Sequence, residues 1–202
     1  MSLLFETIKV ANGKPLNISY HNERINRSRK ELFHCKSELD LAELIKIPDN
    51  HSDGIYKCKV IYSDDIQKIE WARYSPRKIE LLKLVYSDHI EYPYKYLDRK
   101  MFTKLLQLKN CRAAEDILIV KHERITDTSY SNVVLFDGKE WYTPQFSLLK
   151  GTKRAKLINE KIITEKDILA EELKYYEKII LINAMLDFDS GKSYPIRDFI
   201  IT

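Results

Sequence analysis

The chain has 202 residues, of which 44% are hydrophobic and 32% are charged, and it contains only 5 glycines and 6 prolines. This composition excludes disordered, collagen-like and low-complexity proteins, and the length predicts one large domain or two small lobes. Its 34 basic and 30 acidic residues leave a formal net charge of +4, which is too even to indicate a protein that coats nucleic acid.

The cysteines indicate a reducing environment. Cys35, Cys58 and Cys111 lie far apart and form no Cys-x-x-Cys pair, so neither a disulfide framework nor a zinc site is predicted. The chain begins without the basic and apolar regions of a secretory signal, and no apolar run reaches the roughly 18–20 residues of a membrane span. We therefore expect a cytoplasmic protein with no membrane segment.

Periodicity predicts a mixed chain with β-hairpins in both halves. Asn12-Gly13 between two alternating stretches is the strongest hairpin signal, and Asp137-Gly138 marks another. An early helical stretch is predicted as two helices or one broken helix, with Asp40 as a candidate cap. The predicted strands are residues 4–10, 16–20, 56–62, 66–74, 117–120, 133–136, 141–142 and 179–182, and the predicted helices lie within residues 22–45, 100–108 and 155–160.

A punctuated segment in the middle of the chain predicts the boundary between two lobes. Ser75-Pro76-Arg77 interrupts the pattern, and the stretch that follows carries Pro93 among several tyrosines. We place the boundary between residues 76 and 90. The domains expected from this are a smaller N-terminal α/β lobe of residues 1–85 and a larger C-terminal α/β lobe of residues 86–202, and the fold class is α+β or α/β.

Several common sites are absent from the sequence. The five histidines, at 21, 34, 51, 89 and 122, form neither His-x-x-x-His nor His-Glu-x-x-His, so no metal ligands are predicted. The scattered glycines supply neither a Walker loop nor a dinucleotide fingerprint, and no Gly-x-Ser-x-Gly is present. ATP, NAD and serine-hydrolase chemistry are therefore not favoured.

One lysine has neighbours that are nearly all aromatic or apolar. Lys95 stands in the run Tyr92-Pro93-Tyr94-Lys95-Tyr96-Leu97. Burial disfavours an ammonium and lowers its pKa, which is how a lysine becomes a Schiff-base nucleophile or a general base. The alternative is a surface lysine whose alkyl stem passes a cluster of tyrosines.

Two further segments are candidates for phosphate binding. Residues 125–132 are rich in hydroxyl groups and run into an apolar strand, and residues 148–154 place Gly151 at the opening of a helix. Free N–H groups at a helix start, joined by hydroxyl and basic side chains, suit a phosphate. The alternatives are a turn and an ordinary capped helix.

Seven short segments, taken in chain order, carry a family resemblance that covers nearly the whole chain. They are Leu4-Phe5-Glu6-Thr7-Ile8, His21-Asn22-Glu23-Arg24-Ile25, Tyr94-Lys95-Tyr96-Leu97-Asp98-Arg99, residues 125–133, Tyr142-Thr143-Pro144, residues 149–154 and Asn183-Ala184-Met185. In this order and spacing they resemble the class-IV aminotransferases, the fold-type IV pyridoxal-phosphate enzymes that include branched-chain and D-amino-acid aminotransferases and aminodeoxychorismate lyase.

The resemblance implies a cofactor, pyridoxal 5'-phosphate, held in a cleft between two lobes. Lys95 would bind it as a Schiff base and then move a proton between substrate and cofactor. Asp127 would lie against the pyridine nitrogen and keep it protonated. Arg24 would pair with the phosphate in a bidentate manner that a lysine could not reproduce.

The resemblance also implies the rest of the phosphate site. Backbone amides of Gly151, Thr152 and Lys153 would surround the phosphate, with the segment of Asn183 and Ala184 nearby. Four arginines are candidates to bind a substrate carboxylate, and Arg99 is preferred. The candidates are Arg73, Arg77, Arg99 and Arg112.

The sequence departs from the family pattern at three places. Asp127 stands where the family usually has the longer Glu, and Gly151-Thr152-Lys153-Arg154 replaces the more common Gly-Ile-Thr-Arg. The family's usual first strand has no counterpart before Leu4, so substrate-facing residues from that strand are not expected here.

Two reactions on a small amino substrate are compatible with these residues. The favoured one is aminodeoxychorismate-lyase-like elimination of pyruvate to give 4-aminobenzoate, and the alternative is transamination of a branched-chain or D-amino acid. A cofactor-binding protein without activity is a further alternative. A different class, a single-stranded nucleic-acid-binding protein, is kept open by the 13 tyrosines and the mild basic charge. The resemblance also implies a homodimer.

Overall fold

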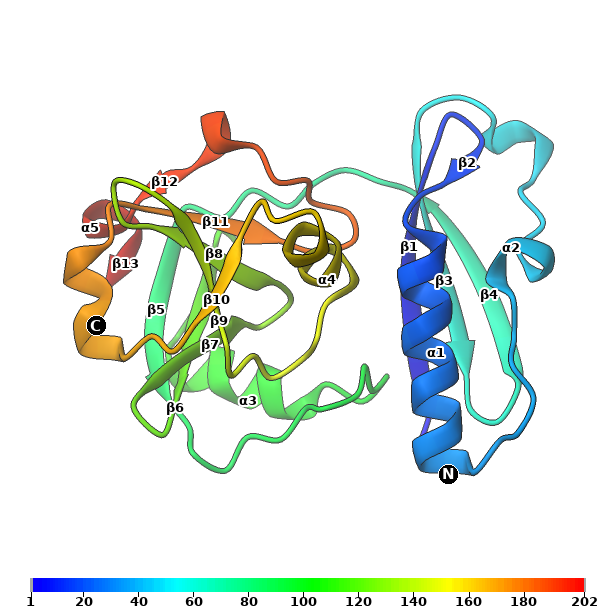
Figure 1. Ribbon diagram of the computed structural model, residues 1–202, viewed down its shortest axis with the longest axis horizontal. Helices are drawn as coiled ribbons and strands as arrows, with labels where there is room; N and C mark the ends of the chain where they lie inside the picture. Colours follow the sequence, from blue (N-terminus) through cyan, green and yellow to red (C-terminus); the bar gives the residue numbers. More distant parts are fainter. Residues whose placement is uncertain (1, 202) are drawn as a thin grey trace. The chain divides into compact units, whose positions relative to one another are not determined.

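The computed structural model describes residues 2–201, which form two compact units (Figure 1). The first unit comprises Met1–Pro76 and Tyr94–Asp98, and the second comprises Arg77–Pro93 and Arg99–Thr202. This division differs in extent from the lobes expected from the sequence, 1–85 and 86–202.

Long-range strand pairing explains where the units divide. Strand β5 (Leu81–Tyr86) pairs in parallel with β6 (Glu115–Lys121), so it belongs to the second unit although nearly all of it falls in the N-terminal lobe expected over residues 1–85. The segment that carries Lys95 returns to the first unit because Tyr96 forms an antiparallel bridge with Leu4.

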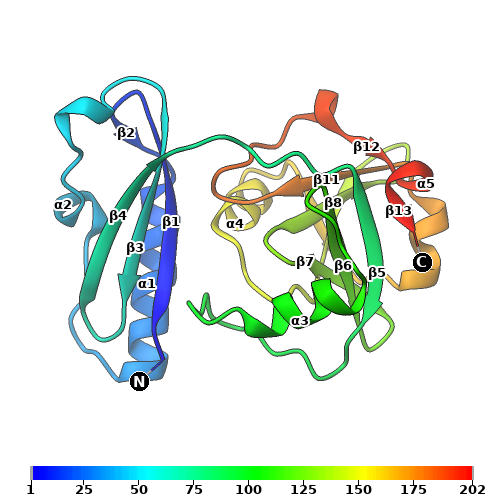
Figure 2. The same cartoon turned by 180° about the vertical axis from the view of Figure 1, so that it is seen from behind.

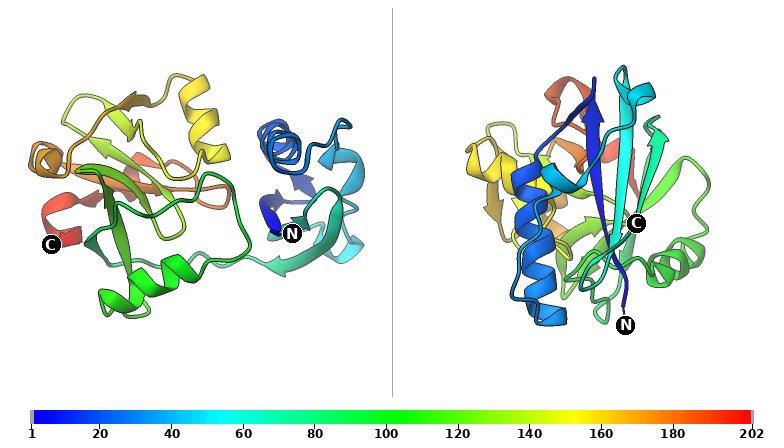
Figure 3. Two further views of the ribbon diagram at one scale, coloured as in Figure 1. Left: turned by 90° about the horizontal axis from the view of Figure 1, so that it is seen from below. Right: turned by 90° about the vertical axis from the view of Figure 1, so that its right-hand side faces the viewer.

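The first unit is a four-stranded sheet with one long helix across one face (Figure 3). The sheet order is β2-β1-β3-β4, and β1 is antiparallel to both of its neighbours. Leu4 and Ile8 of the sheet and Ile25 of the helix are fully buried in the core of this unit. Its elements are β1 (Leu4–Ala11), β2 (Lys14–Pro15), α1 (Ile18–Phe33), α2 (Leu41–Leu44), the 3-10 turn η1 (Asp49–His51), β3 (Ile55–Tyr62) and β4 (Ile66–Arg73).

The first hairpin is confirmed, but its second strand is much shorter than predicted. Asn12 and Gly13 have φ values of 48° and 70°, which match the right-handed twist of paired strands. The strand predicted at residues 16–20 was wrong, because Asn17 turns the chain into the left-handed region at φ 56° and α1 starts at Ile18. The cap predicted at Asp40 is confirmed by its carboxylate, which accepts from the Ala42 amide at 2.9 Å.

The second unit is a nine-stranded mixed sheet with α3 beside its parallel pair (Figure 2). The main order is β10-β9-β8-β7-β6-β5-β13, and β11 joins through β8 and carries β12. The remaining bounds are α3 (Lys100–Leu108), β7 (Arg124–Thr128), β8 (Asn132–Phe136), β9 (Trp141–Pro144), α4 (Thr152–Asn159), β10 (Thr164–Lys166), η2 (Ala170–Tyr175), β11 (Lys178–Ile182), η3 (Ser190–Lys192), β12 (Tyr194–Pro195), α5 (Ile196–Phe199) and β13 (Ile200–Ile201).

Most strands of the second unit follow the predicted pattern. The hairpin at Asp137-Gly138 is confirmed by the pairing of Leu135 with Tyr142, and Gly138 has φ 94°. The hydroxyl-rich stretch forms β7, a turn and the start of β8, instead of a turn alone. Helix α4 begins at Thr152, earlier than the predicted residue 155, so the predicted phosphate segment lies in its first turn. Among residues 2–201 no helix is long and apolar enough to cross a bilayer.

Candidate active site

A buried carboxylate organises the polar residues of the first unit. Glu6 lies on β1 between Leu4 and Ile8, with 0% of its surface exposed. Arg24 on α1 donates from Nε to Glu6 Oε1 at 2.8 Å and from Nη2 to Oε2 at 2.6 Å. His21, one turn earlier on α1, donates from Nδ1 to Oε2 at 2.6 Å. The helix therefore presents a cation and an imidazole to one strand carboxylate.

Charge and burial set the protonation states of this cluster in opposite directions. Burial alone would raise the pKa of Glu6, but Arg24 and His21 outweigh it and hold that pKa at about 2. Burial lowers the pKa of His21, and the Arg24 and Lys95 charges lower it further, so the neutral imidazole is favoured. Among residues 2–201, His21 Nε2 is buried with no hydrogen-bond partner. The cluster thus contains a permanent ion pair and an orphaned ring nitrogen.

Lys95 lies beside the same strand. The Phe5 amide donates to the Lys95 carbonyl at 2.9 Å, and the Leu97 amide donates to the Leu3 carbonyl at 2.8 Å. The Lys95 ammonium stands 4.6 Å from the centroid of the Phe5 ring, a cation–π contact, and the residue is half-buried. The structure therefore brings two residues predicted from the sequence, Lys95 and Arg24, to adjacent positions along β1.

The second unit holds Asp127 in a buried hydrogen-bonded position on β7. Its Oδ1 accepts from Asn132 Nδ2 at 2.8 Å, and its Oδ2 accepts from the Leu149 amide at 2.9 Å. Only 5% of the residue is exposed, and burial raises the pKa of the carboxyl to about 6 despite these donors. This carboxyl can therefore respond to a nearby cationic nitrogen by losing its proton near neutral pH.

The first turn of α4 lies against the same residues. Gly151 is the N-cap of α4, and the Asn132 amide that holds Asp127 also donates to the Leu149 carbonyl at 2.8 Å. A Cβ added at Gly151 would stand 2.0 Å from Asn132 Oδ1, so only glycine fits there. Thr152 and Lys153 are both buried. Asp127 and the predicted phosphate segment thus share Asn132 as a common support.

The structure places the other predicted residues in the second unit as well. Asn183 Oδ1 accepts from the Met185 amide at 2.8 Å and the Leu186 amide at 3.0 Å, which closes a turn that contains Ala184. Arg99, at the start of α3, donates from Nη2 to the Ser129 carbonyl, two residues after Asp127. The guanidinium carbon of Arg99 also lies 4.9 Å from the Phe102 ring centroid.

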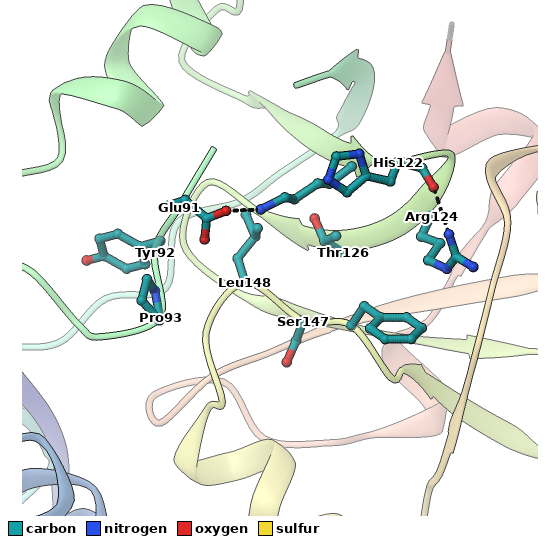
Figure 4. Close-up of a pocket in the computed structure, with 10 residues that line it drawn as sticks. Glu91, Tyr92, Pro93, His122, Arg124, Thr126, Ser147 and Leu148 are labelled. Carbon is teal, nitrogen blue, oxygen red and sulfur yellow. Dashed lines mark hydrogen bonds and ion pairs between the residues drawn. The ribbon is translucent and has the colours of Figure 1, made fainter. Parts of the chain in front are cut away.

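The second unit has a cavity of about 380 Å³ whose lining does not include the predicted site residues (Figure 4). Thr126 lines it, and strand alternation directs Thr126 and its neighbour Asp127 to opposite faces of β7. Lys121 is paired with Glu91, and Arg124 lies 3.0 Å from Asp167. The basic groups of this cavity are therefore neutralised by protein. Its lining residues are Glu91, Tyr92, Pro93, Lys121, His122, Arg124, Thr126, Phe146, Ser147 and Leu148.

Sequence reasoning assigned no role to three residues that the structure shows at these positions: Glu6, Asn132 and Asp187. Glu6 carried a readable signal, because it falls in phase with Leu4 and Ile8 on the buried face of β1, where a carboxylate requires a partner. Asn132 stands in the motif of residues 125–133, but nothing in the sequence shows that its amide joins Asp127 to the Leu149 carbonyl. Asp187 gave no signal, because its partner Lys153 lies 34 residues away in the chain.

Replacing Glu6 with glutamine is expected to destabilise the protein by about 3–5 kcal/mol at pH 7, because it leaves a buried arginine without its counter-ion. The pKa of Glu6 is depressed in the folded state, so its contribution is present above about pH 4.5 and is lost as the pH falls towards about 2. Urea unfolding at pH 7 and pH 3 measures this. The variant and the wild type should differ far less at pH 3, whereas Glu70→Gln, a surface ion-pair control, should change little at either pH.

Replacing Gly151 with alanine is expected to cost about 1–3 kcal/mol of unfolding free energy, because the new Cβ overlaps Asn132 Oδ1. The same change should weaken the Asn132 hydrogen bond to Asp127. Urea unfolding of the single variants and of the double variant with Asn132→Ala checks the mechanism. Equal destabilisation by Gly151→Ala in the presence and absence of the Asn132 side chain would contradict it.

The two units, a sheet with one long helix and a larger mixed sheet, have the fold of the fold-type IV enzymes, which solved structures of similar proteins share. The family model for amino-transferase class IV matches residues 3–190 of the chain. The protein therefore belongs to the class-IV aminotransferase family, and the family and fold class predicted from its motifs are confirmed.

Similar proteins agree with this assignment. A crystal structure from Haemophilus somnus 129pt, a proposed 4-amino-4-deoxychorismate lyase, is 34% identical with a TM-score of 0.82 and covers 93% of this chain and 98% of its own. An uncharacterized protein of Haemophilus influenzae is 35% identical over 90% of this chain and 97% of its own length. A hypothetical aminotransferase from Mycobacterium tuberculosis in its PLP-bound form shares the fold at 17% identity, with a TM-score of 0.71, and covers 91% of this chain and 78% of its own.

Proposed function

We propose that the protein is a pyridoxal-phosphate-dependent enzyme that acts on a small amino substrate through Lys95. The observation that carries this proposal is the backbone pairing that holds Lys95 against β1, beside the buried Glu6 and Arg24 pair. These main-chain hydrogen bonds fix the backbone of Lys95, so its side chain extends from a defined position beside β1. Members of this family depend on this cofactor in general.

The residues of both units have the chemistry that the cofactor requires. Asp127 offers a buried carboxyl whose pKa is raised to about 6, suited to a protonated pyridine nitrogen. Helix α4 starts at Thr152, and its N-cap Gly151 has no side chain to cap it, so the N–H groups of its first turn suit a phosphate. Arg24 supplies a guanidinium for the phosphate, and His21 Nε2, an acceptor in the neutral imidazole that donates through Nδ1, is a further buried polar atom of the same cluster. The residues of the two units therefore include a carboxyl for the pyridine nitrogen and N–H donors for a phosphate.

Each side chain then has a separate task. When bound, the cofactor supplies an electron sink for the carbon next to the substrate nitrogen. The Lys95 amine takes and returns a proton at that carbon, as a general base and acid. Asp127 holds a proton on the pyridine nitrogen through its negative charge. Glu6 fixes the Arg24 guanidinium, so its orientation towards an anion is set before the anion arrives.

For the particular reaction, we infer elimination of pyruvate from aminodeoxychorismate to give 4-aminobenzoate. It is supported by the relative at 34% identity that is a proposed 4-amino-4-deoxychorismate lyase, and by the Asn183-Ala184-Met185 segment, which resembles the lyases. Arg99, held at the Ser129 carbonyl, is the proposed carboxylate-binding residue for this substrate. Transamination of an amino acid is the alternative reaction on the same groups.

The absorbance spectrum of the purified protein with added cofactor tests the first step. We expect a pyridoxal-type band, its loss on borohydride reduction, and a modified peptide containing Lys95 by mass mapping. A missing band, or an adduct on another lysine, would overturn the proposal. The second step is an assay for 4-aminobenzoate from aminodeoxychorismate beside one for keto acids from a panel of amino acids.

We also propose a homodimer, which gel filtration at several concentrations would test.

A further inference from the structure

Helix α4 carries an unusual charge pattern in its first turn. Lys153 and Arg154 are the second and third residues of the helix, and no acidic residue accompanies them in that turn. The N-terminus of a helix has a partial positive charge, so cations there are disfavoured and anions are favoured. Both residues are also buried, with 6% and 4% of their surface exposed. Two buried cations at this place require nearby negative groups.

The two cations obtain that compensation differently. Arg154 Nη2 donates to the Pro144 carbonyl at 2.9 Å and to Glu165 at 2.5 Å, so it is tied to the protein frame by two neighbours. Lys153 Nζ lies 2.5 Å from Asp187 Oδ1. The Lys153 side chain is 8% exposed, whereas that of Asp187 is 54% exposed. Asp187 is therefore the solvent-exposed member of this ion pair, and the Lys153 ammonium is the buried one.

The position of Asp187 in the chain links it to one of the segments expected near the cofactor phosphate. It directly follows the turn that Asn183 closes through the Met185 and Leu186 amides. That turn and the first turn of α4 are the two segments proposed for the cofactor phosphate. The Lys153–Asp187 pair is thus a contact between those two segments, and it puts an ammonium group where they meet.

We propose that the Lys153 side chain is a ligand of the cofactor phosphate and that Asp187 is its stand-in counter-ion when no cofactor is bound. The proposal rests on the proposed function, and it concerns how this chain retains its cofactor. A phosphate dianion compensates a buried ammonium better than one exposed carboxylate does. The family pattern has a neutral threonine at this position, so the lysine adds a charge that selects for a phosphorylated ligand.

The test compares pyridoxal 5'-phosphate with pyridoxal, which lacks the phosphate, by equilibrium absorbance titration of four proteins. Lys153→Met should weaken binding of the phosphorylated form by about 10- to 100-fold, the effect of losing a charge-assisted hydrogen bond, and leave pyridoxal binding unchanged. Asp187→Asn should tighten binding of the phosphorylated form, because the competing anion is gone. Lys156→Met, on the same helix, should match the wild type.

Thermal unfolding supplies a readout that needs no activity. Asp187→Asn should lower the melting temperature of the cofactor-free protein and show a larger gain on adding inorganic phosphate than the wild type does. Lys153→Arg, which keeps the charge, should retain more of the phosphate preference than Lys153→Met and serves if the latter fails to fold. The inference is overturned if Lys153→Met binds both ligands like the wild type, or if Asp187→Asn weakens binding. A wild type that binds neither ligand would instead overturn the proposed function.

Discussion

Lys95→Met is expected to lower turnover by roughly 10²- to 10⁴-fold or more, the range for losing a positioned proton-transfer group. The variant also loses the amine proposed to form the covalent link, so borohydride reduction should attach no cofactor to this position. Methionine keeps an unbranched stem against Phe5, and the carbonyl of residue 95 still accepts from the Phe5 amide. The fold should therefore survive, which separates chemistry from stability.

The control for this substitution is Lys100→Met, an exposed lysine at the start of α3. It should leave turnover and the borohydride adduct unchanged. Steady-state assays and peptide mapping of the reduced protein measure both variants. Retained turnover in Lys95→Met, or an adduct that persists elsewhere in the chain, would remove Lys95 from its proposed role.

Asp127→Asn is expected to reduce activity. It is also expected to gain stability relative to the wild type as the pH rises. Activity should fall by roughly 10²- to 10³-fold, as when one preorganised electrostatic contact is removed, because an amide cannot hold a proton on the pyridine nitrogen. Asp127→Glu, which keeps the charge and restores the family's usual residue, should retain more activity than Asn. An Asn variant as active as the Glu variant would contradict the assigned role.

The stability effect follows from the sign of the pKa shift. Burial raises the pKa of Asp127 from 3.8 to about 6, so the folded cofactor-free protein holds this proton more tightly than the unfolded chain does. Its contribution to stability therefore falls as the pH rises from about 4 to about 6. Relative to the wild type, Asp127→Asn should gain on the order of 2–3 kcal/mol between pH 4 and pH 7.5. Denaturant unfolding at both pH values checks this, and a constant difference would show that Asp127 titrates normally.

Local features of the chain were predictable wherever one short segment contains the cause. The Asn12-Gly13 turn and the Asp40 cap depend on backbone preferences and side-chain hydrogen bonds within a few residues, and both are confirmed. The strand predicted at residues 16–20 failed for a related reason. Alternation there is compatible with either state, and the left-handed Asn17 decides for the helix.

The family resemblance rested on the order of short motifs, which a linear sequence records in full. For this reason Lys95, Asp127 and Gly151 could be named as candidates without a structure. The sequence could not show which distant groups hold the candidate residues in place. Glu6 reaches His21 and Arg24 across the interface of a strand and a helix, and Asn132 supports Asp127 from the next strand.

The sequence by itself thus determined the family and the approximate positions of turns and strands, because these depend on local residue order, and it named Lys95 as the candidate lysine. Only the tertiary structure decided that the Lys95 segment pairs with β1 and that Lys153 meets Asp187. These contacts join residues far apart in the chain, and no periodicity or local propensity encodes the partner.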